Sequence, residues 1–218
     1  NYNNKFLTLI DTFVLHKYIN KDRYFNNLTE EISEINENIF FIPTIVITSN
    51  QDKKNLLDLF KEIRNSKRNF LLKEDFLDIY DVLFSLTHYF RIFKFKKFKF
   101  KYKNIDYSTL IYSEFYSLVN FNMTIEALLN YRFIKKLKKN NIKIRYFINW
   151  WENQPLDKSI NYALNKYYKN TDVVGYLGYV PKSLELNIYP YANEISAGVI
   201  PKSIAVIGKG YVDSIKKF

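Results

Sequence analysis

The stretch "IKIRYFINWWENQPLDKSINYALNKYYKNTDVVGYLGYV" at Ile142–Val180 decides the fold class of this chain. Its first part, Ile142–Asn153, is typical of a strand that runs into a polar corner, and its last part, Thr171–Val180, of a second buried strand. Between them, Pro155–Asn170 predicts a helix with the proline in its first turn, where the missing N–H costs nothing. A strand–helix–strand unit of this length indicates a right-handed crossover between parallel strands. We therefore expect an α/β fold.

Further elements are expected on both sides of this unit. The strands are Lys5–Leu15, ending near Asp11, Asn38–Thr48 and Ser203–Gly208, and the helices are Asn26–Asn36, Asn50–Ser66, Leu72–Phe93, Tyr107–Phe121 and Met123–Asn141. Pro43 in the second run indicates a kink or an edge strand. The pattern predicts a Rossmann-like, mostly parallel sheet with flanking and inserted helices. Residues 1–203 would form this domain, with a helical insertion at about 72–140, and residues 204–218 would form a strand and a linker.

The composition supports a packed core and excludes several kinds of site. Of 218 residues, 47% are hydrophobic and 18% aromatic, which is ample material for a core. The chain has no cysteine, which excludes disulfides, zinc–thiolate sites and a cysteine nucleophile. Its two histidines, His16 and His88, are too far apart in sequence to suggest a metal site, and we predict none. The apolar run Ile39–Ile47 is far shorter than the roughly 20 residues that span a bilayer.

The net charge of +11 has two competing explanations. A strongly basic protein attracts phosphates or an anionic membrane surface. The chain is also crowded with Lys, Asn, Ile, Phe and Tyr, whose codons are rich in A and T, so a biased genome alone raises lysine above arginine. The sequence leaves both explanations open.

The segment "FKFKKFKFKYK" at Phe93–Lys103 concentrates this charge among aromatic rings. No acidic residue occurs from Thr87 to Asn104. The doubled lysine at its centre shifts the alternation, so we expect a helix end followed by a short extended connector. Our hypothesis is a peripheral membrane contact through basic residues, namely Arg91, Lys94, Lys96, Lys97, Lys99, Lys101 and Lys103. A connector shaped only by composition is the alternative, and nucleic-acid binding is less favoured because no binding motif is present.

The corner "NWWENQPLDK" at Asn149–Lys158 is where chemistry is expected. In open parallel sheets, ligands bind where strands end and helices begin. Glu152 would lie at this edge, beside the positive end of the following helix, where a carboxylate can act as a general base or hold a sugar hydroxyl. The two tryptophans before it could stack on a sugar ring or exclude water. Alternatively, Glu152 only caps the helix while Trp150 and Trp151 fill the core.

The motifs after this corner resemble those of a known family. "WWENQPLDKSINYALNKYYKNTDVVGYLGYVP", followed by "YPYANEISAGVIPKSIAVIGKGYV", is similar to the central region of bacterial surface-carbohydrate biosynthesis proteins. These are GT-B-type glycosyltransferases found in O-antigen and capsule loci. The resemblance is clear over Trp150–Val212 and weaker at "LTLIDTF" and "FLLKEDFLDIYDVL". The absence of an Asp-x-Asp pattern separates the chain from metal-dependent GT-A enzymes.

The resemblance implies the N-terminal, acceptor-side domain of a cytoplasmic enzyme that is inactive without a donor-binding domain after Phe218. A peripheral position at the inner membrane is compatible with this expectation. A nucleotide sugar would be a substrate rather than a cofactor, and the partner would be a saccharide or lipid-linked acceptor. Glu152 becomes the catalytic candidate, and the loop from Gly178 to Glu194 would face the cleft between domains. The implied substrate-binding residues are Asp11, Trp151, Asn153, Gln154, Asp157, Gly178, Tyr179 and Glu194. A non-catalytic structural or interaction domain of the same pathway is the alternative, followed by a basic nucleic-acid-binding protein.

Overall fold

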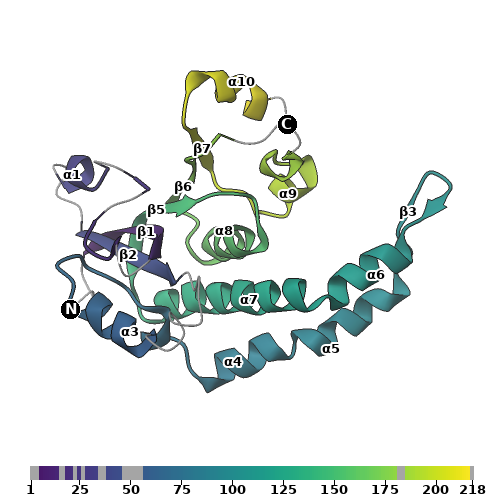
Figure 1. Cartoon of the computed structure of the whole chain (residues 1–218), viewed down its shortest axis with the longest axis horizontal. Helices are drawn as coiled ribbons and strands as arrows, with labels where there is room; N and C mark the ends of the chain where they lie inside the picture. Colours follow the sequence, from purple (N-terminus) through teal and green to yellow (C-terminus); the bar gives the residue numbers. More distant parts are fainter. Residues whose placement is uncertain are drawn as a thin grey trace.

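A five-stranded, all-parallel sheet forms the centre of the protein (Figure 1). The computed structural model describes residues 5–14, 18–21, 24–25, 28–33, 38–45, 56–180 and 185–216. The strands are β1 (Phe6–Val14), β2 (Asn38–Ile45), β5 (Lys143–Trp150), β6 (Asp172–Leu177) and β7 (Ser203–Val206). Their order in the sheet is β2-β1-β5-β6-β7. The chain therefore moves outward from β1 in both directions, which places a topological switch point between β1 and β5.

Helices flank this sheet and extend beyond it. The α-helices are α1 (Leu28–Ser33), α3 (Leu56–Arg64), α4 (Ile79–Leu86), α5 (His88–Ile92), α6 (Ser108–Tyr116), α7 (Leu118–Lys139), α8 (Pro155–Tyr167), α9 (Ala192–Ser196) and α10 (Lys209–Lys216). The 3₁₀ turns are η2 (Lys73–Asp75), η3 (Phe93–Lys97) and η4 (Leu186–Ile188). A two-stranded hairpin joins β3 (Lys101–Tyr102) to β4 (Ile105–Asp106).

The core lies between the sheet and the pair α7 and α8. Leu9 of β1, Phe147 of β5, Ile134 of α7 and Leu164 of α8 are all fully buried in one cluster. Because successive strand side chains point to opposite faces, Ile10 of β1 enters a second cluster on the other face, beside α1. The sheet therefore buries apolar residues on both faces, as parallel sheets require.

The direction of α7 places its first half near the carboxyl edge of the sheet. A short turn at residues 140–142 joins the end of α7 to the start of β5, so the helix runs antiparallel to that strand. Its 22 residues span about 33 Å, more than the length of the strand. The first turn of α7 therefore extends past the carboxyl edge, and the elements that precede it lie on that side.

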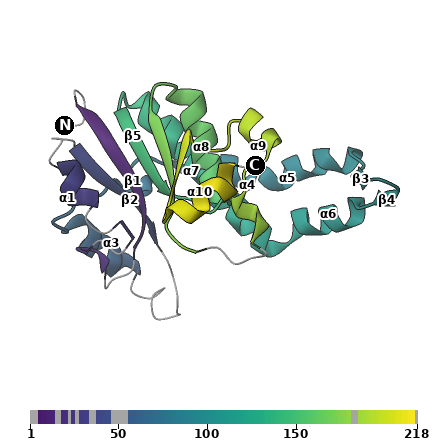
Figure 2. The ribbon, with the colours of Figure 1, turned by 90° about the horizontal axis from the view of Figure 1, so that it is seen from above.

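Residues 79–116, comprising α4, α5, η3, the β3–β4 hairpin and α6, form an arm. Two views at right angles show it projecting from the α/β body (Figures 1 and 2). Asp78 begins its first helix by accepting hydrogen bonds from the backbone N–H groups of Tyr80 (3.0 Å) and Asp81 (3.2 Å). At its other end, the hydroxyl of Ser117 accepts a hydrogen bond from the N–H of Asn120 (3.2 Å) and begins α7.

Ion pairs fix the base of the arm to α7. The fully buried carboxylate of Asp81 on α4 binds Arg132 of α7 and lies 3.2 Å from Nζ of Lys136. The same lysine lies 2.5 Å from Oδ2 of Asp78. The orientation of α4 against α7 thus depends on a buried anion that receives two cations.

The structure confirms the expected α/β class and corrects several boundaries. All five strand regions are present, and Pro43 lies in the edge strand β2. The single helix expected at Leu72–Phe93 is wrong: the chain forms η2, then α4 and α5, because the Asp78 cap begins a new helix. β1 continues past Asp11 to Val14. Within the helical insertion expected at about 72–140, α7 packs on the sheet. The part of this region that projects from the body is the arm.

Within the residues that the structure describes, no helix combines the length and the hydropathy needed to cross a bilayer.

Replacing Asp81 with Ala should destabilise the protein by about 3 kcal/mol, because Arg132 and Lys136 lose the buried carboxylate that neutralises them. Urea denaturation followed by circular dichroism measures the change. Asp58→Ala is the matched control, since Asp58 forms an exposed pair with Lys61 and its removal should have little effect. Equal effects of the two substitutions on stability would contradict a buried, stabilising role for the carboxylate of Asp81.

Candidate active site at the carboxyl edge of the sheet

The switch point between β1 and β5 brings together charged groups from distant parts of the chain. Asp11 lies on β1, on the face that α7 and α8 cover, near the strand's carboxyl end. The β5–α8 corner supplies Glu152 and Asp157. Lys73 follows the segment that pairs with β2 through the parallel bridge between Phe41 and Phe70, so it reaches the same edge.

Asp11 lies in a mixed-charge environment. The hydroxyl of Thr44 donates a hydrogen bond to its Oδ1 (3.1 Å). Burial raises the pKa of Asp11, the positive charge of Lys73 and the Thr44 hydrogen bond oppose this rise, and the negative charge of Glu126 adds to it. The ammonium of Lys73 in turn donates to Oδ1 of Asn130 on α7 (2.6 Å). The carboxyl group of Asp11 thus has more affinity for a proton than an exposed aspartate.

Asp157 fixes the turn between β5 and α8. Its Oδ2 accepts hydrogen bonds from the backbone N–H groups of Glu152 (2.8 Å) and Gln154 (3.0 Å). Burial raises its pKa to about 7; the two backbone hydrogen bonds lower it, and the charges of Asp11 and Glu152 raise it. A carboxyl group with this pKa can both accept and release a proton near neutral pH.

Glu152 is held by its neighbours. Nε1 of Trp150 donates to one carboxylate oxygen (2.7 Å), and Nε2 of Gln154 donates to the other (2.8 Å). Its carboxylate does not cap α8, since Asp157 accepts from the first N–H groups of that corner. The structure therefore gives Glu152 a different role from the cap that its position suggested: it connects the indole of Trp150 to the start of the helix.

The two adjacent tryptophans have opposite environments. Trp150 lies in an aromatic group on the α1 side of the sheet and stacks on Tyr179 with nearly parallel rings, whose centroids are 6.3 Å apart at an interplanar angle of 19°. Its other aromatic neighbours are Phe13, Tyr24, Phe25 and Tyr176. Trp151 is fully buried among Leu177, Ile188 and Ile200. Its ring supports the fold in this structure and has no surface to offer to a ligand.

Asn153 and Glu194 connect the corner to α9. Asn153 has a φ of 56°, a left-handed conformation that asparagine tolerates better than most residues. Its Nδ2 donates to the carbonyl of Asn187 (2.7 Å) and to Oε2 of Glu194 (3.2 Å). Burial opposes ionisation of Glu194, but the ammonium of Lys158, 2.5 Å from Oε1, and the other hydrogen bonds keep its pKa below the usual value.

Gly178 and Tyr179 lie beside Trp150. A Cβ at Gly178 would lie 2.5 Å from Cε1 of Tyr176 and 2.6 Å from Cζ3 of Trp150, so only glycine leaves room for these rings. The hydroxyl of Tyr179 donates to Oε1 of Glu185 (3.2 Å), and burial raises its pKa, to which the nearby charges of Glu152 and Glu185 add. Residues 181–184 of the loop expected to face a cleft lie outside the described residues.

The structure thus groups most of the residues that the sequence singled out. Asp11, Glu152 and Asp157 interact electrostatically, and Tyr179 lies close to the last two. Sequence reasoning missed Thr44, Lys73, Glu126 and Asn130, which complete the surroundings of Asp11. Only Thr44 had a signal, because it lies near the carboxyl end of a predicted strand that neighbours β1.

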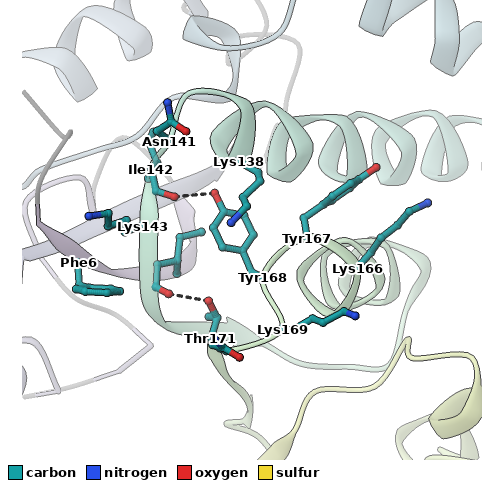
Figure 3. Close-up of a pocket in the computed structure, with 12 residues that line it drawn as sticks. Phe6, Lys138, Asn141, Ile142, Lys143, Lys166, Tyr167, Tyr168, Lys169 and Thr171 are labelled. Carbon is teal, nitrogen blue, oxygen red and sulfur yellow. Dashed lines mark hydrogen bonds between the residues drawn. The ribbon is translucent and has the colours of Figure 1, made fainter.

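A cavity of about 550 Å³ lies at the opposite, amino-terminal edge of the sheet (Figure 3). Tyr168 and Thr171 form its wall and donate to the carbonyls of Ile142 (2.9 Å) and Ile144 (2.6 Å). Its lining includes the basic residues Lys138, Lys143, Lys166 and Lys169. This cavity is separate from the carboxyl-edge group, and no sequence motif indicated it.

The described residues contain no group of three or more His, Cys, Asp or Glu side chains that could hold a metal ion. Comparisons with protein families, curated proteins and solved structures found no match to this chain. The chemistry of the carboxyl edge must therefore be judged on its geometry.

Replacing Gly175 with Ala should destabilise the protein by about 2 kcal/mol, because the added Cβ would lie 2.7 Å from Pro201 Cγ and 2.9 Å from Trp151 Cβ. Gly210→Ala is the control, since a Cβ there meets nothing within 4 Å and alanine favours the helix α10. Chemical denaturation of both variants measures the difference. A Gly175 variant as stable as the control would refute the close packing beneath the corner.

Replacing Asp157 with Asn should change the pH dependence of stability. Because the pKa of Asp157 is raised on folding, the folded state holds its proton more tightly than the unfolded chain, and this advantage is lost as pH rises toward 7. Asparagine has no such loss. The difference in unfolding free energy, variant minus wild type, should therefore rise by about 2 kcal/mol from pH 5 to pH 8. This value is smaller than the full pKa shift would give, because the carboxyl group is partly exposed to solvent.

Urea titrations at several pH values test this result, with Asp58→Asn on α3 as an exposed control whose difference from the wild type should stay constant. A constant difference for Asp157→Asn as well would show that the carboxyl group titrates normally.

Proposed function

We propose that this chain is the acceptor-side domain of a glycosyltransferase that transfers a sugar from a nucleotide sugar to a surface-polysaccharide or lipid-linked acceptor. The observation that carries the proposal is the pair Asp11 and Asp157 at the switch point of a parallel sheet, with the pKa of Asp157 raised to about 7. Carboxyl groups with perturbed pKa values at this edge are typical of sites where hydroxyl groups are activated. The motifs of Trp150–Val212 that resemble surface-carbohydrate enzymes support the same assignment.

In this mechanism the acceptor hydroxyl attacks the anomeric carbon of the donor. A bond forms between the hydroxyl oxygen and that carbon while the bond from the carbon to the phosphate oxygen breaks, and the electron pair leaves with the nucleotide. Asp157 accepts the proton of the hydroxyl, a role for which a pKa near neutral is suited. Asp11 accepts a hydrogen bond from the acceptor, and Lys73 offsets the negative charge of Asp11.

Glu152 acts in this scheme as a positioning residue rather than as the base. Both of its carboxylate oxygens accept hydrogen bonds from Trp150 and Gln154, and its own N–H binds Asp157. It therefore sets the orientation of the corner. The donor would bind mainly to a further domain, and the loop from Gly178 to Glu194 would face it.

A non-catalytic domain of the same pathway is the second candidate. The observation in its favour is that Glu152, Asn153 and Glu194 are all engaged in hydrogen bonds within the protein. These side chains then hold the corner to α9 and do no chemistry. The two candidates differ in what they require of Asp11 and Asp157.

Substitution of Asp11 and Asp157 with Asn in the encoding organism tests the proposal. Loss of the base in Asp157→Asn should lower transfer on the order of 100-fold, and Asp11→Asn removes the carboxylate that binds the acceptor, so each variant should lose most of the surface polysaccharide seen by gel electrophoresis. Immunoblots should show normal protein abundance, and Asp58→Asn on α3 serves as the exposed control. A gene deletion gives the reference for complete loss.

The outcomes separate the candidates. Loss of polysaccharide in the deletion strain but not in either site variant would overturn the catalytic assignment and favour the non-catalytic domain. An unchanged polysaccharide in the deletion strain would overturn both.

A further inference from the structure

The arm exposes an unusual amount of apolar surface. Its exposed side chains from α5 to α6 are between 40% and 70% accessible, and they are Tyr89, Phe90, Phe93, Phe95, Phe98, Tyr102, Ile105 and Leu110. Soluble proteins rarely leave so many aromatic and aliphatic residues together in water unless the surface binds something. The arm also projects away from the body, so the α/β domain does not cover it (Figures 1 and 2).

The shape of the arm's end is fixed by internal contacts. The hydroxyl of Tyr112 on α6 donates to the carbonyls of Phe95 (2.9 Å) and Phe98. The N–H of Phe100 donates to Ser108 Oγ (2.9 Å), and its ring packs against Tyr112, with centroids 5.9 Å apart. The inner aromatic residues thus pack against α6, and the outer ones remain exposed on a formed surface.

The tip, defined as residues 93–106, adds positive charge to this apolar surface. Lys94, Lys97, Lys99, Lys101 and Lys103 are exposed on it. No acidic residue occurs in the sequence from Thr87 to Ile105, and Asp106 at the end of the hairpin binds the N–H of Ser108 (2.9 Å). Asp106 also interacts electrostatically with Lys101 and Lys99 and offsets part of their charge, but the lysines of the tip far outnumber this one acidic residue of the segment.

Two residues of the predicted membrane contact differ from the others. Arg91 donates to the carbonyl of Phe84 (2.7 Å) with its guanidinium 4.4 Å from the centre of that ring, and burial lowers its pKa. These contacts hold Arg91 against Phe84 of α4, and its expected role as a membrane contact stays a prediction. The side chain of Lys96 lies outside the described residues.

We propose that the tip docks on the interface of an anionic lipid bilayer, with Phe98, Tyr102 and Ile105 inserted at the level of the headgroups. Lysines around them would bind lipid phosphates, while their aliphatic stems lie along the apolar surface. Aromatic rings interleaved with lysines suit this boundary, where an apolar layer meets a layer of negative charge.

Charge complementarity favours a membrane over a second copy of the chain. The protein carries a net charge of +11, and two arms pressed together would bring their lysines into contact. An anionic bilayer supplies negative lipid phosphates for the lysines and an apolar layer for the exposed rings. The proposal does not depend on glycosyl transfer. If the tip docks in this way, the carboxyl edge of the sheet lies on the side of the domain that faces the membrane.

Flotation with lipid vesicles tests the proposal. Vesicles of 70% phosphatidylcholine and 30% phosphatidylglycerol should carry the chain upward in a density gradient, and vesicles of phosphatidylcholine alone should bind at least ten-fold more weakly. Replacing Lys97, Lys99, Lys101 and Lys103 with Gln should weaken binding to the anionic vesicles at least ten-fold. In the matched control, Gln replaces Lys138, Lys139, Lys143 and Lys169. These substitutions remove the same amount of charge at the opposite edge of the sheet.

A second set of variants tests insertion. Replacing Phe98, Tyr102 and Ile105 with Ser should abolish the binding that remains at 0.5 M salt, because only the apolar contacts resist screening. The chain has no cysteine, so Tyr102→Cys can carry a polarity-sensitive dye. Its fluorescence should shift to the blue on anionic vesicles, and the same dye at Asn170→Cys, at the opposite edge, should not shift. Circular dichroism confirms that each variant is folded.

Three results would overturn the proposal. The first is equal loss of vesicle binding in the two lysine sets, which would reflect net charge alone. The second is binding of a single-stranded oligonucleotide through the tip lysines without binding to vesicles. The third is a concentration-dependent dimer that the aromatic substitutions dissociate, which would assign the tip to a second copy.

Discussion

The structure of the candidate site depends on one oxygen of one carboxylate. Oδ2 of Asp157 accepts the backbone N–H groups of both Glu152 and Gln154, and this fixes where β5 ends and α8 begins. Asn153, between the two, is turned into a left-handed conformation that directs its side chain toward α9. The positions of the corner side chains follow from this turn. Without these two hydrogen bonds, the buried N–H groups at the end of β5 would need other partners.

A buried carboxylate at this turn is electrostatically unfavourable, and this cost indicates a role beyond stability. Burial withdraws Asp157 from water, and the negative charges of Asp11 and Glu152 add to this effect, so its pKa rises to about 7. Asparagine or serine would accept the same N–H groups without bringing a charge into this environment. A fold selected for stability alone has no need of an aspartate here. Charged groups held under such conditions are more common at functional sites than elsewhere.

The sequence predicted the fold and part of the site for identifiable reasons. The strand–helix–strand pattern of Ile142–Val180 is local, and local periodicity together with the handedness of crossovers is sufficient to predict a parallel sheet. Asp11, Glu152 and Asp157 could be identified because each lies near the carboxyl end of a predicted strand or the start of the following helix.

The parts that the sequence did not predict depend on long-range contacts. Lys73 reaches the site only through the bridge between Phe41 and Phe70, and Asn130 only because α7 runs back along the sheet. The different burial of the adjacent Trp150 and Trp151 depends on which face each strand position takes, and residue type carries no information on that. The break in the helix expected at Leu72–Phe93 depends on a side-chain cap at Asp78 that competes with helix continuation.

The helix α7 relates the arm to the candidate site. Its second half is buried in the core through Phe133, Ile134 and Leu137, while Asn130, one turn earlier, binds Lys73 beside Asp11. Arg132 and Lys136 of the same helix bind the carboxylates that orient α4. Both ends of the arm are therefore attached to one rigid element, and no flexible linker separates the tip from the sheet. Whatever surface the tip contacts, the position of the carboxyl edge relative to that surface is set by the direction of α7.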